Sequence, residues 1–97
     1  MKYVFCIEIK SFYQDASGVD YLMTDIGCPP ILISSFRRAV KRMESIRKQR
    51  VEMFGESLVK NYAADELPEG YCYDRVEFSC PLTKLRTIVS LYKVYVS

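Results

Sequence analysis

The residues best suited to do chemistry in this 97-residue chain are basic and lie close together. The stretch from Ser35 to Phe54 has seven basic and two acidic residues, a balance of +5, whereas the remainder has seven basic and ten acidic residues, a balance of −3. Clustered guanidinium and ammonium groups bind phosphates or the carboxylates of an acidic protein surface. The seven basic residues are Arg37, Arg38, Lys41, Arg42, Arg47, Lys48 and Arg50.

A single helix is expected to present most of these side chains. No glycine, proline or aspartate occurs from Phe36 to Phe54, Ser34 or Ser35 is suited to cap the start, and Gly55 is suited to end it. On a helical wheel, the apolar residues occupy one arc and most of the basic residues the opposite one. An ordinary solvated helix face is the alternative interpretation, because lysine and arginine are good helix formers. The basic residues on the polar side are Arg37, Arg38, Lys41, Arg42 and Lys48.

Arg47 and Arg50 differ from the other basic residues, because the wheel places them near the middle of the apolar arc. A guanidinium there must pair with a carboxylate, extend to the edge of the apolar surface, or lie over an aromatic ring. The alternative that we favour is that the last two turns of the helix project beyond the rest of the fold as a basic arm.

A second candidate surface is aromatic. Tyr71, Tyr73 and Arg75 alternate along one predicted strand, and Tyr92 lies in the next. Strand faces that combine rings with cations stack unpaired bases in sheet-based RNA binders. The glycines of the usual RNA-recognition strand motif are absent, however, so these four residues also fit ordinary packing or a contact between protein chains.

The residues of common catalytic sites are missing. The chain has no histidine, the commonest general base and zinc ligand, and it contains neither a nucleophile-elbow nor a phosphate-loop motif. The closest cysteines, Cys72 and Cys80, are separated by seven residues, which is unlike the tight ligand pairs of structural zinc sites. We therefore expect Cys6, Cys28, Cys72 and Cys80 to be free, with no metal, no cofactor and no enzymatic activity. A carboxylate-only or arginine-assisted enzyme is the remaining catalytic alternative.

The elements around the helix are predicted to be strands. Residues 2–12 alternate between apolar and mixed positions, 19–26 form a weaker strand after a turn signal, and 71–80 and 84–96 are rich in tyrosine and β-branched residues. A short helical turn is expected within 56–62 and a loop at 65–70. The predicted fold is a single α+β domain over residues 1–97, with two layers: a four-stranded antiparallel sheet in ββαββ order and one long basic amphipathic helix on one face.

The last predicted strand is apolar on both of its sides. Leu85, Val89 and Leu91 share one side, and Ile88 and Val94 lie on the other. Such a strand is expected either at the centre of a sheet covered on both faces or in an interface between subunits.

The composition and the longest apolar stretches predict a cytoplasmic protein that does not enter a membrane. Glu8 and Lys10 interrupt the first apolar stretch too early for a signal peptide, and the run Ile31, Leu32, Ile33 is far shorter than a membrane span.

These observations together predict a small non-catalytic binding protein. The leading hypothesis is that the basic helix contacts the backbone of a nucleic acid. The alternative is a protein-interaction or inhibitor module that uses the open sheet face or a strand edge, either to form a homodimer or to cover an acidic partner. A short, histidine-free chain with a basic helix is also typical in composition of small accessory proteins of phages and mobile elements.

Overall fold

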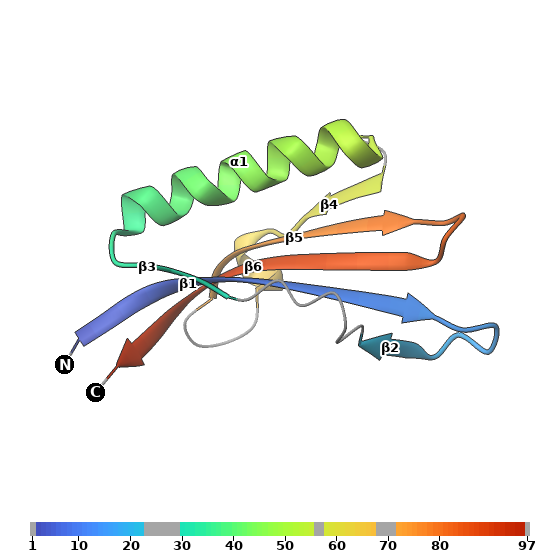
Figure 1. Ribbon diagram of the computed structural model, residues 1–97, viewed down its shortest axis with the longest axis horizontal. Helices are drawn as coiled ribbons and strands as arrows, with labels where there is room; N and C mark the ends of the chain where they lie inside the picture. Colours follow the sequence, from blue (N-terminus) through green and yellow to red (C-terminus); the bar gives the residue numbers. More distant parts are fainter. Residues whose placement is uncertain (1, 23–29, 56–57, 68–71, 97) are drawn as a thin grey trace.

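Figure 1 shows the computed structural model, which describes residues 2–22, 30–55, 58–67 and 72–96. The fold is α+β, with one antiparallel sheet in the order β2-β1-β6-β5-β4, while β3 pairs with β1 beside β2. The elements along the chain are β1 (Lys2–Gln14), β2 (Asp20–Leu22), β3 (Ile31–Ile33), α1 (Phe36–Phe54), β4 (Val59–Asn61), the 3-10 helix η2 (Ala64–Glu66), β5 (Cys72–Cys80) and β6 (Leu85–Val96).

The predicted four-stranded sheet in ββαββ order is wrong. The sheet has six strands, of which three precede α1 and three follow it. The two additional strands, β3 and β4, are three residues long, which is too short for an alternating pattern to stand out in the sequence. β4 also replaces part of the helical turn expected within residues 56–62. Both strands form because long neighbours, β1 and β5, offer backbone partners along their edges.

The two predicted hairpins are present. β1 pairs with β2 through a turn in which the Asp15 carboxylate accepts hydrogen bonds from the Ser17 hydroxyl at 2.7 Å and the Val19 amide at 3.0 Å. β5 pairs with β6 through a turn closed by the Lys84 amide, which donates to the Cys80 carbonyl at 2.9 Å. Of the predicted second strand, residues 23–26 lie outside the described residues.

Helix α1 begins and ends where the sequence predicts. The Ser35 hydroxyl accepts from the Arg38 amide at 3.4 Å, which satisfies one of the free amides of the first turn. At the other end the Gly55 amide donates to the Val51 carbonyl at 2.8 Å. Gly55 has a φ of 88°, a left-handed conformation that side chains disfavour, so glycine is the residue suited to stop the helix there.

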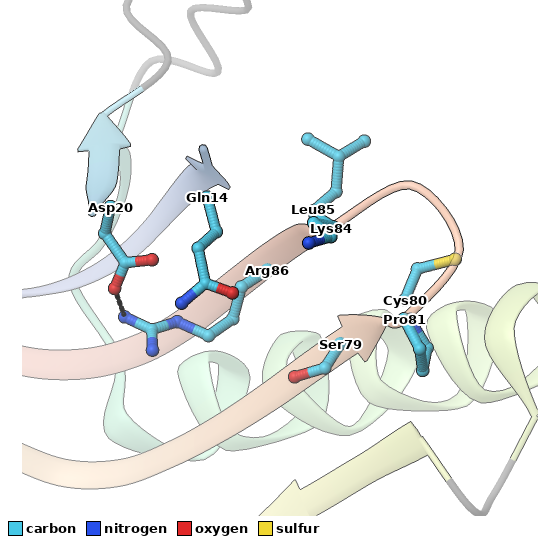
Figure 2. A pocket seen from close by; sticks show the side chains of 8 residues that line it. All are labelled: Gln14, Asp20, Ser79, Cys80, Pro81, Lys84, Leu85 and Arg86. Atoms are coloured by element: carbon cyan, nitrogen blue, oxygen red, sulfur yellow. Dashed lines mark ion pairs between the residues drawn. The ribbon is translucent and has the colours of Figure 1, made fainter. Parts of the chain in front are cut away.

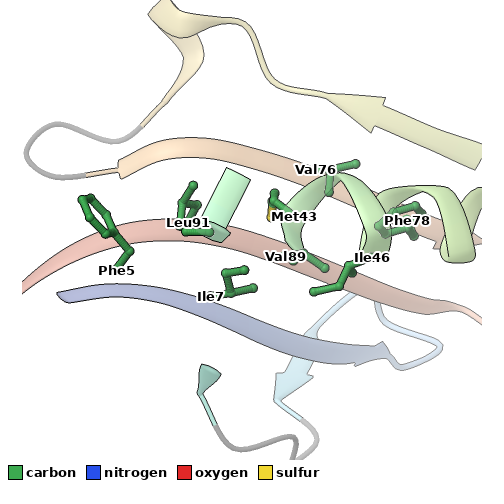
Figure 3. Packing of buried hydrophobic residues seen from close by; sticks show 9 residues of the cluster. Phe5, Ile7, Met43, Ile46, Val76, Phe78, Val89 and Leu91 are labelled. Atoms are coloured by element: carbon green, nitrogen blue, oxygen red, sulfur yellow. The ribbon is translucent and has the colours of Figure 1, made fainter. Parts of the chain in front are cut away.

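The core lies between α1 and the sheet face that it covers, as Figure 3 shows. Met43 and Ile46 of the helix pack against side chains of three long strands, and those that the helix covers most fully are Phe5, Ile7, Val76, Phe78, Val89 and Leu91. Burying each such side chain contributes about 1.5–3 kcal/mol, so this layer supplies most of the apolar stabilisation.

β6 is the central strand of the sheet, with β1 on one side and β5 on the other. The central position agrees with the first of the two predicted alternatives, but among the described residues only the face beneath α1 is covered by another element, not both faces as that alternative required. Its odd-numbered residues face α1, and its even-numbered residues form part of the opposite face, named here the open face. Within the described residues no helix is both long enough and apolar enough to cross a membrane.

Candidate functional site

The outer side of α1 carries five exposed basic residues. Their side chains form no ion pair or hydrogen bond with any residue that the structure describes. The helix also has no acidic residue in its first turn and no basic residue in its last turn. The five residues are the ones that the wheel places on the polar side: Arg37, Arg38, Lys41, Arg42 and Lys48.

Arg47 lies on the other side of the helix and is held by the sheet. Its Nη2 donates to both carboxylate oxygens of Asp74, at 3.1 and 2.9 Å, and its Nε donates to Asn61 Oδ1 at 2.8 Å. Both side chains of the ion pair are largely shielded, with 26% of Arg47 and 33% of Asp74 exposed. The guanidinium thus ties α1 to β4 and β5.

The interpretation that the last two turns of α1 project beyond the core is therefore wrong at Arg47, and also at Val51, which packs against the core cluster. Of the three alternatives for a guanidinium in the apolar arc, pairing with a carboxylate is the one found at Arg47. β4 extends the sheet beneath this part of the helix, and its presence could not be predicted from three residues. Arg50, the other basic residue of the arc, is half-buried.

The predicted aromatic surface is divided between the two faces of the sheet. A β-bulge lies between Cys72 and Asp74, so the alternation of β5 changes there. Tyr73 consequently lies on the α1 side, with its ring centroid 5.3 Å from that of Phe36, while Arg75 lies on the open face. The expectation that Tyr73 and Arg75 share a face is wrong for this reason. Tyr71 lies outside the described residues.

Arg75 and Tyr92 do meet, in a cavity of about 210 Å³ on the open face. The guanidinium of Arg75 donates to Ser90 Oγ at 3.0 Å and to the Tyr92 hydroxyl oxygen at 2.9 Å, and it lies 5.6 Å from the centre of the Tyr62 ring. The cavity is lined by Glu8, Lys10, Phe12, Arg75, Ile88, Ser90 and Tyr92. Two hydroxyls and a ring therefore immobilise Arg75 without neutralising its charge.

Three other cations of the open face are paired with carboxylates, whereas Lys2, which lies opposite Val96 on this face, forms no ion pair with any residue that the structure describes. Lys10 lies 3.2 Å from Glu8, and Lys60 lies 3.2 Å from a Glu66 carboxylate oxygen. The pKa of Lys60 is raised, first by its hydrogen bond with Glu66 and then by the charge of that carboxylate.

Arg86 lies between two carboxylates of the open face. Its Nη2 is 3.2 Å from Asp20, the pair drawn in Figure 2, and its Nε is 3.6 Å from Glu77. Carboxylates thus neutralise Lys10, Lys60 and Arg86 of this face locally, while Arg75 and Lys2 have no carboxylate partner in the described structure.

A second cavity, of about 220 Å³, lies beside the β5–β6 turn (Figure 2). Cys80 and Pro81 line it on the turn, and Asp20 and Arg86 line it from the sheet. Hydrogen bonds from the Thr83 hydroxyl and the Thr83 and Leu82 amides lower the pKa of the Cys80 thiol. This cavity therefore combines an ion pair with one thiol that ionises more readily than usual.

The described cysteines are free and differ in their surroundings. Cys6 is buried and Cys72 and Cys80 are half-buried, while Cys28 lies outside the described residues. Burial raises the pKa of the Cys6 thiol, with a further contribution from the charge of Glu8, and burial also raises that of Cys72. Among the residues that the structure places, no group of three or more cysteine, aspartate or glutamate side chains is arranged to hold a metal ion.

Sequence reasoning missed a cluster of aromatic side chains beside the start of α1. Tyr3 and Phe5 of β1, Phe36 of α1, Tyr73 of β5 and Tyr95 of β6 form a chain of ring contacts on the α1 side of the sheet. The ammonium of Lys93 lies 4.1 Å from the centre of the Tyr3 ring. The spacing of Tyr3 and Phe5 in the sequence predicts that these two rings share a face of one strand. The other three rings come from different elements, and only the strand register and the packing of α1 place them beside Tyr3 and Phe5.

No family model matches this chain, and neither a curated protein nor a solved structure is significantly similar to it.

Proposed function

We propose that this chain is a small, non-catalytic binding protein whose helix α1 contacts the phosphate backbone of a nucleic acid with little reading of base sequence. The observation that carries the proposal is the difference in pairing between cations. The five basic residues on the outer side of α1 have no carboxylate partner in the described structure, whereas Lys10, Lys60 and Arg86 of the open face each have one. Unpaired, solvated cations are the ones free to replace the counterions of a polyanion.

The position of the cations along α1 also supports the proposal. Arg37 and Arg38 lie in the first turn, at the positive end of the helix dipole, where each cation costs about 0.3–1 kcal/mol rather than contributing stability. Basic residues retained only for solubility or helix stability would be favoured in the last turn, which has none. Residues that oppose local stability, such as cations at the start of a helix, occur in natural proteins at functional sites.

The five basic residues on the outer side of α1 extend over a length that fits several consecutive phosphates, and they are called the basic row below. At a rise of about 1.5 Å per residue, Arg37 and Lys48 are separated by roughly 16 Å along the helix axis. One strand of a duplex advances about 3.4 Å per phosphate, so the row matches roughly five phosphates.

The proposal is tested by measuring the affinity for a random-sequence DNA duplex and its RNA equivalent over a range of salt concentrations. If all five cations contact phosphates, the logarithm of the binding constant should fall with the logarithm of salt concentration with a slope of about −4.5. Arg38→Glu combined with Lys41→Glu should weaken binding to every sequence and reduce the slope by roughly two.

A matched control is Lys10→Glu combined with Lys60→Glu, which gives the same net charge but alters paired lysines of the open face. This control should bind nearly as well as the unaltered protein. Binding that does not depend on salt, or equal losses in the two double variants, would contradict a specific role for the helix.

A protein-interaction module is the second candidate, supported by the apolar side chains exposed on the open face. Leu32 is 65% exposed, and Val94 and Val96 are each 39% exposed near the end of β6. Exposed apolar side chains are a common feature of protein interfaces when they gather on one face. This candidate predicts a homodimer in solution whose dissociation constant rises on Val94→Asp and changes little with salt.

A further inference from the structure

We propose that the nucleic acid bound by this protein is single-stranded, and that its unpaired bases stack on an aromatic platform formed by Tyr3, Phe36, Tyr73 and Tyr95. The inference rests on the proposed function, because it places bases beside the same helix that would hold the phosphates. The platform lies at the end of the sheet where the chain begins and ends, beside the start of α1 (Figure 1).

The four rings of the platform are exposed to similar extents. Tyr3 and Phe36 are each 46% exposed, Tyr73 is 44% exposed and Tyr95 is 41% exposed, whereas Phe5, on which three of them pack, is 6% exposed. Large apolar side chains gathered in one exposed patch cost solvation free energy, which a partner that covers them would recover. The buried Phe5 ring supports the platform from below.

The ring geometry leaves surfaces for further stacking. Tyr3 meets Tyr95 at a centroid distance of 6.2 Å and an interplanar angle of 73°, and Phe36 meets Tyr73 at 5.3 Å and 63°. In such edge-to-face contacts one ring presents an edge rather than its face to the other. The aromatic partners therefore do not cover both faces of every ring. A flat nucleobase can stack on a ring face that these neighbours leave uncovered.

The charge around the platform identifies the partner as an anion with planar groups. The Lys93 ammonium lies 4.1 Å from the centre of the Tyr3 ring and 5.2 Å from that of Tyr95, and it has no carboxylate partner in the described chain. Arg37 and Arg38, both exposed, directly follow Phe36. A hydrophobic segment of a protein would bury these three charges without compensation, whereas phosphates would neutralise them while bases occupy the rings.

A single strand fits this surface better than a duplex does. Bases within a duplex are already stacked and paired, so their faces are not available to protein rings, whereas the bases of a single strand are. A base that reached the platform would continue the run of rings from Phe36 and Tyr73 while its strand passed along the first turns of α1. The platform therefore adds a preference for unpaired nucleic acid to the salt-dependent attraction of the helix.

The experiment compares two labelled probes at the same salt concentration: an oligothymidine of about 20 nucleotides, longer than the footprint of most small single-strand binders, and a DNA duplex of equal length. The unaltered protein should bind the oligothymidine more tightly. Tyr73→Ala and Tyr3→Ala should each weaken that binding on the order of tenfold while leaving duplex binding almost unchanged.

Three variants separate stacking from folding. Tyr73→Phe should retain tight single-strand binding because it keeps the ring, whereas Tyr73→Leu keeps apolar volume without a ring and should lose it. Tyr13→Ala is the matched control for Tyr3→Ala. Tyr13 lies on the same strand and the same face as Tyr3, is also 46% exposed, and lies at the other end of β1, so its removal should leave both affinities unchanged.

The failure of this inference differs from the failure of the proposed function. Equal affinities for the two probes, or equal effects of Tyr3→Ala and Tyr13→Ala, would overturn the platform but leave the role of the helix intact. No salt-dependent binding of either probe would overturn both. A change in solution mass caused by Tyr73→Ala, without a change in oligothymidine affinity, would assign the platform to a protein interface and overturn its role in base stacking.

Discussion

The outer side of α1 and the open face of the sheet both carry several cations, but most of those on the open face are paired with carboxylates and none of the five on the helix is. On the open face, Lys10, Lys60 and Arg86 each lie within 3.2 Å of a carboxylate, and Arg75 is fixed by two hydroxyls. On the helix, Arg38 and Lys41 extend into solvent with no partner in the described structure.

This difference teaches that pairing, as well as the number of basic residues, decides which cations of a surface are left available to an anionic partner. A carboxylate beside a cation must be displaced or repelled before a phosphate approaches, which removes much of the gain from releasing counterions. Net charge conceals the distinction, because the chain as a whole is close to neutral at +2.

The largest expected effect is on stability, and it comes from comparing a paired and an unpaired cation of the same helix α1. Arg47→Met should lower the free energy of unfolding by about 1–3 kcal/mol, because it removes charged hydrogen bonds and leaves Asp74 partly buried without its partner. Arg38→Met, which removes an unpaired cation of the same helix, should change stability by no more than about 0.5 kcal/mol. Urea denaturation measures both. Equal losses would mean that the Arg47 pair contributes nothing specific to the fold.

A smaller effect is expected from removing the neutralising charges of the open face. Glu8→Gln with Glu77→Gln leaves Lys10 unpaired and leaves Arg86 with Asp20 alone. If pairing with carboxylates is what keeps these cations from binding phosphates, the open face should become a second surface that binds polyanions. The affinity for duplex DNA at low salt should then increase about tenfold, with a steeper salt dependence.

The control for this gain is Asp65→Asn, which removes one exposed carboxylate from η2 that forms no ion pair in the described structure. An equal gain in affinity per removed charge in this control would show that net charge alone controls binding. The distinction between the two surfaces would then be lost.

The smallest effect concerns the turn that positions Asp20 beside Arg86. Hydrogen bonds from the Ser17 hydroxyl, the Val19 amide and the Ser17 amide, the last at 2.9 Å, lower the pKa of Asp15. Because the folded pKa lies below the unfolded one, this stabilisation is complete above the unfolded carboxyl's pKa and is lost as pH falls through the folded pKa. Amide-exchange protection at Ser17 and Val19 should therefore decrease on acidification, before the sheet unfolds.

In Asp15→Ala the protection of these amides should already be low at neutral pH and should not respond to acid. Protection in the unaltered turn that is independent of pH would contradict the role assigned to the Asp15 carboxylate. Retention of the Arg86–Asp20 pair in Asp15→Ala would show that the hydrogen bonds of the turn are not required to position β2.

The parts of the fold that follow from local periodicity were predictable. The limits of α1 from Phe36 to Phe54 are confirmed because capping and stop residues act within one turn of the helix. The long strand β1 is confirmed because alternation over many residues is distinctive, and β6 is confirmed because a long run rich in tyrosine and β-branched residues favours a strand. β3 and β4 were not predictable, since a three-residue strand is specified by the neighbour that it pairs with.

The candidate surfaces were predictable to a different extent. Exposure of the five outer cations follows from the helical wheel, and their contact with nucleic acid stays a prediction. The aromatic surface was misjudged because one bulge before Asp74 reverses the facing of β5, which placed Tyr73 with Phe36 and left Arg75 with Tyr92. A single additional residue in a strand has this effect because its side chains alternate with a period of two.

The sequence by itself determined where the helix lies, which residues are charged, and that common histidine chemistry is excluded. Only the tertiary structure decided that Arg47 is bound to Asp74, that Lys10, Lys60 and Arg86 of the open face are paired with carboxylates, and that Tyr3, Phe36, Tyr73 and Tyr95 meet. The reason is physical: periodicity and capping act over a few neighbouring residues, whereas ion pairs and ring contacts form between segments that only strand register and helix packing bring together.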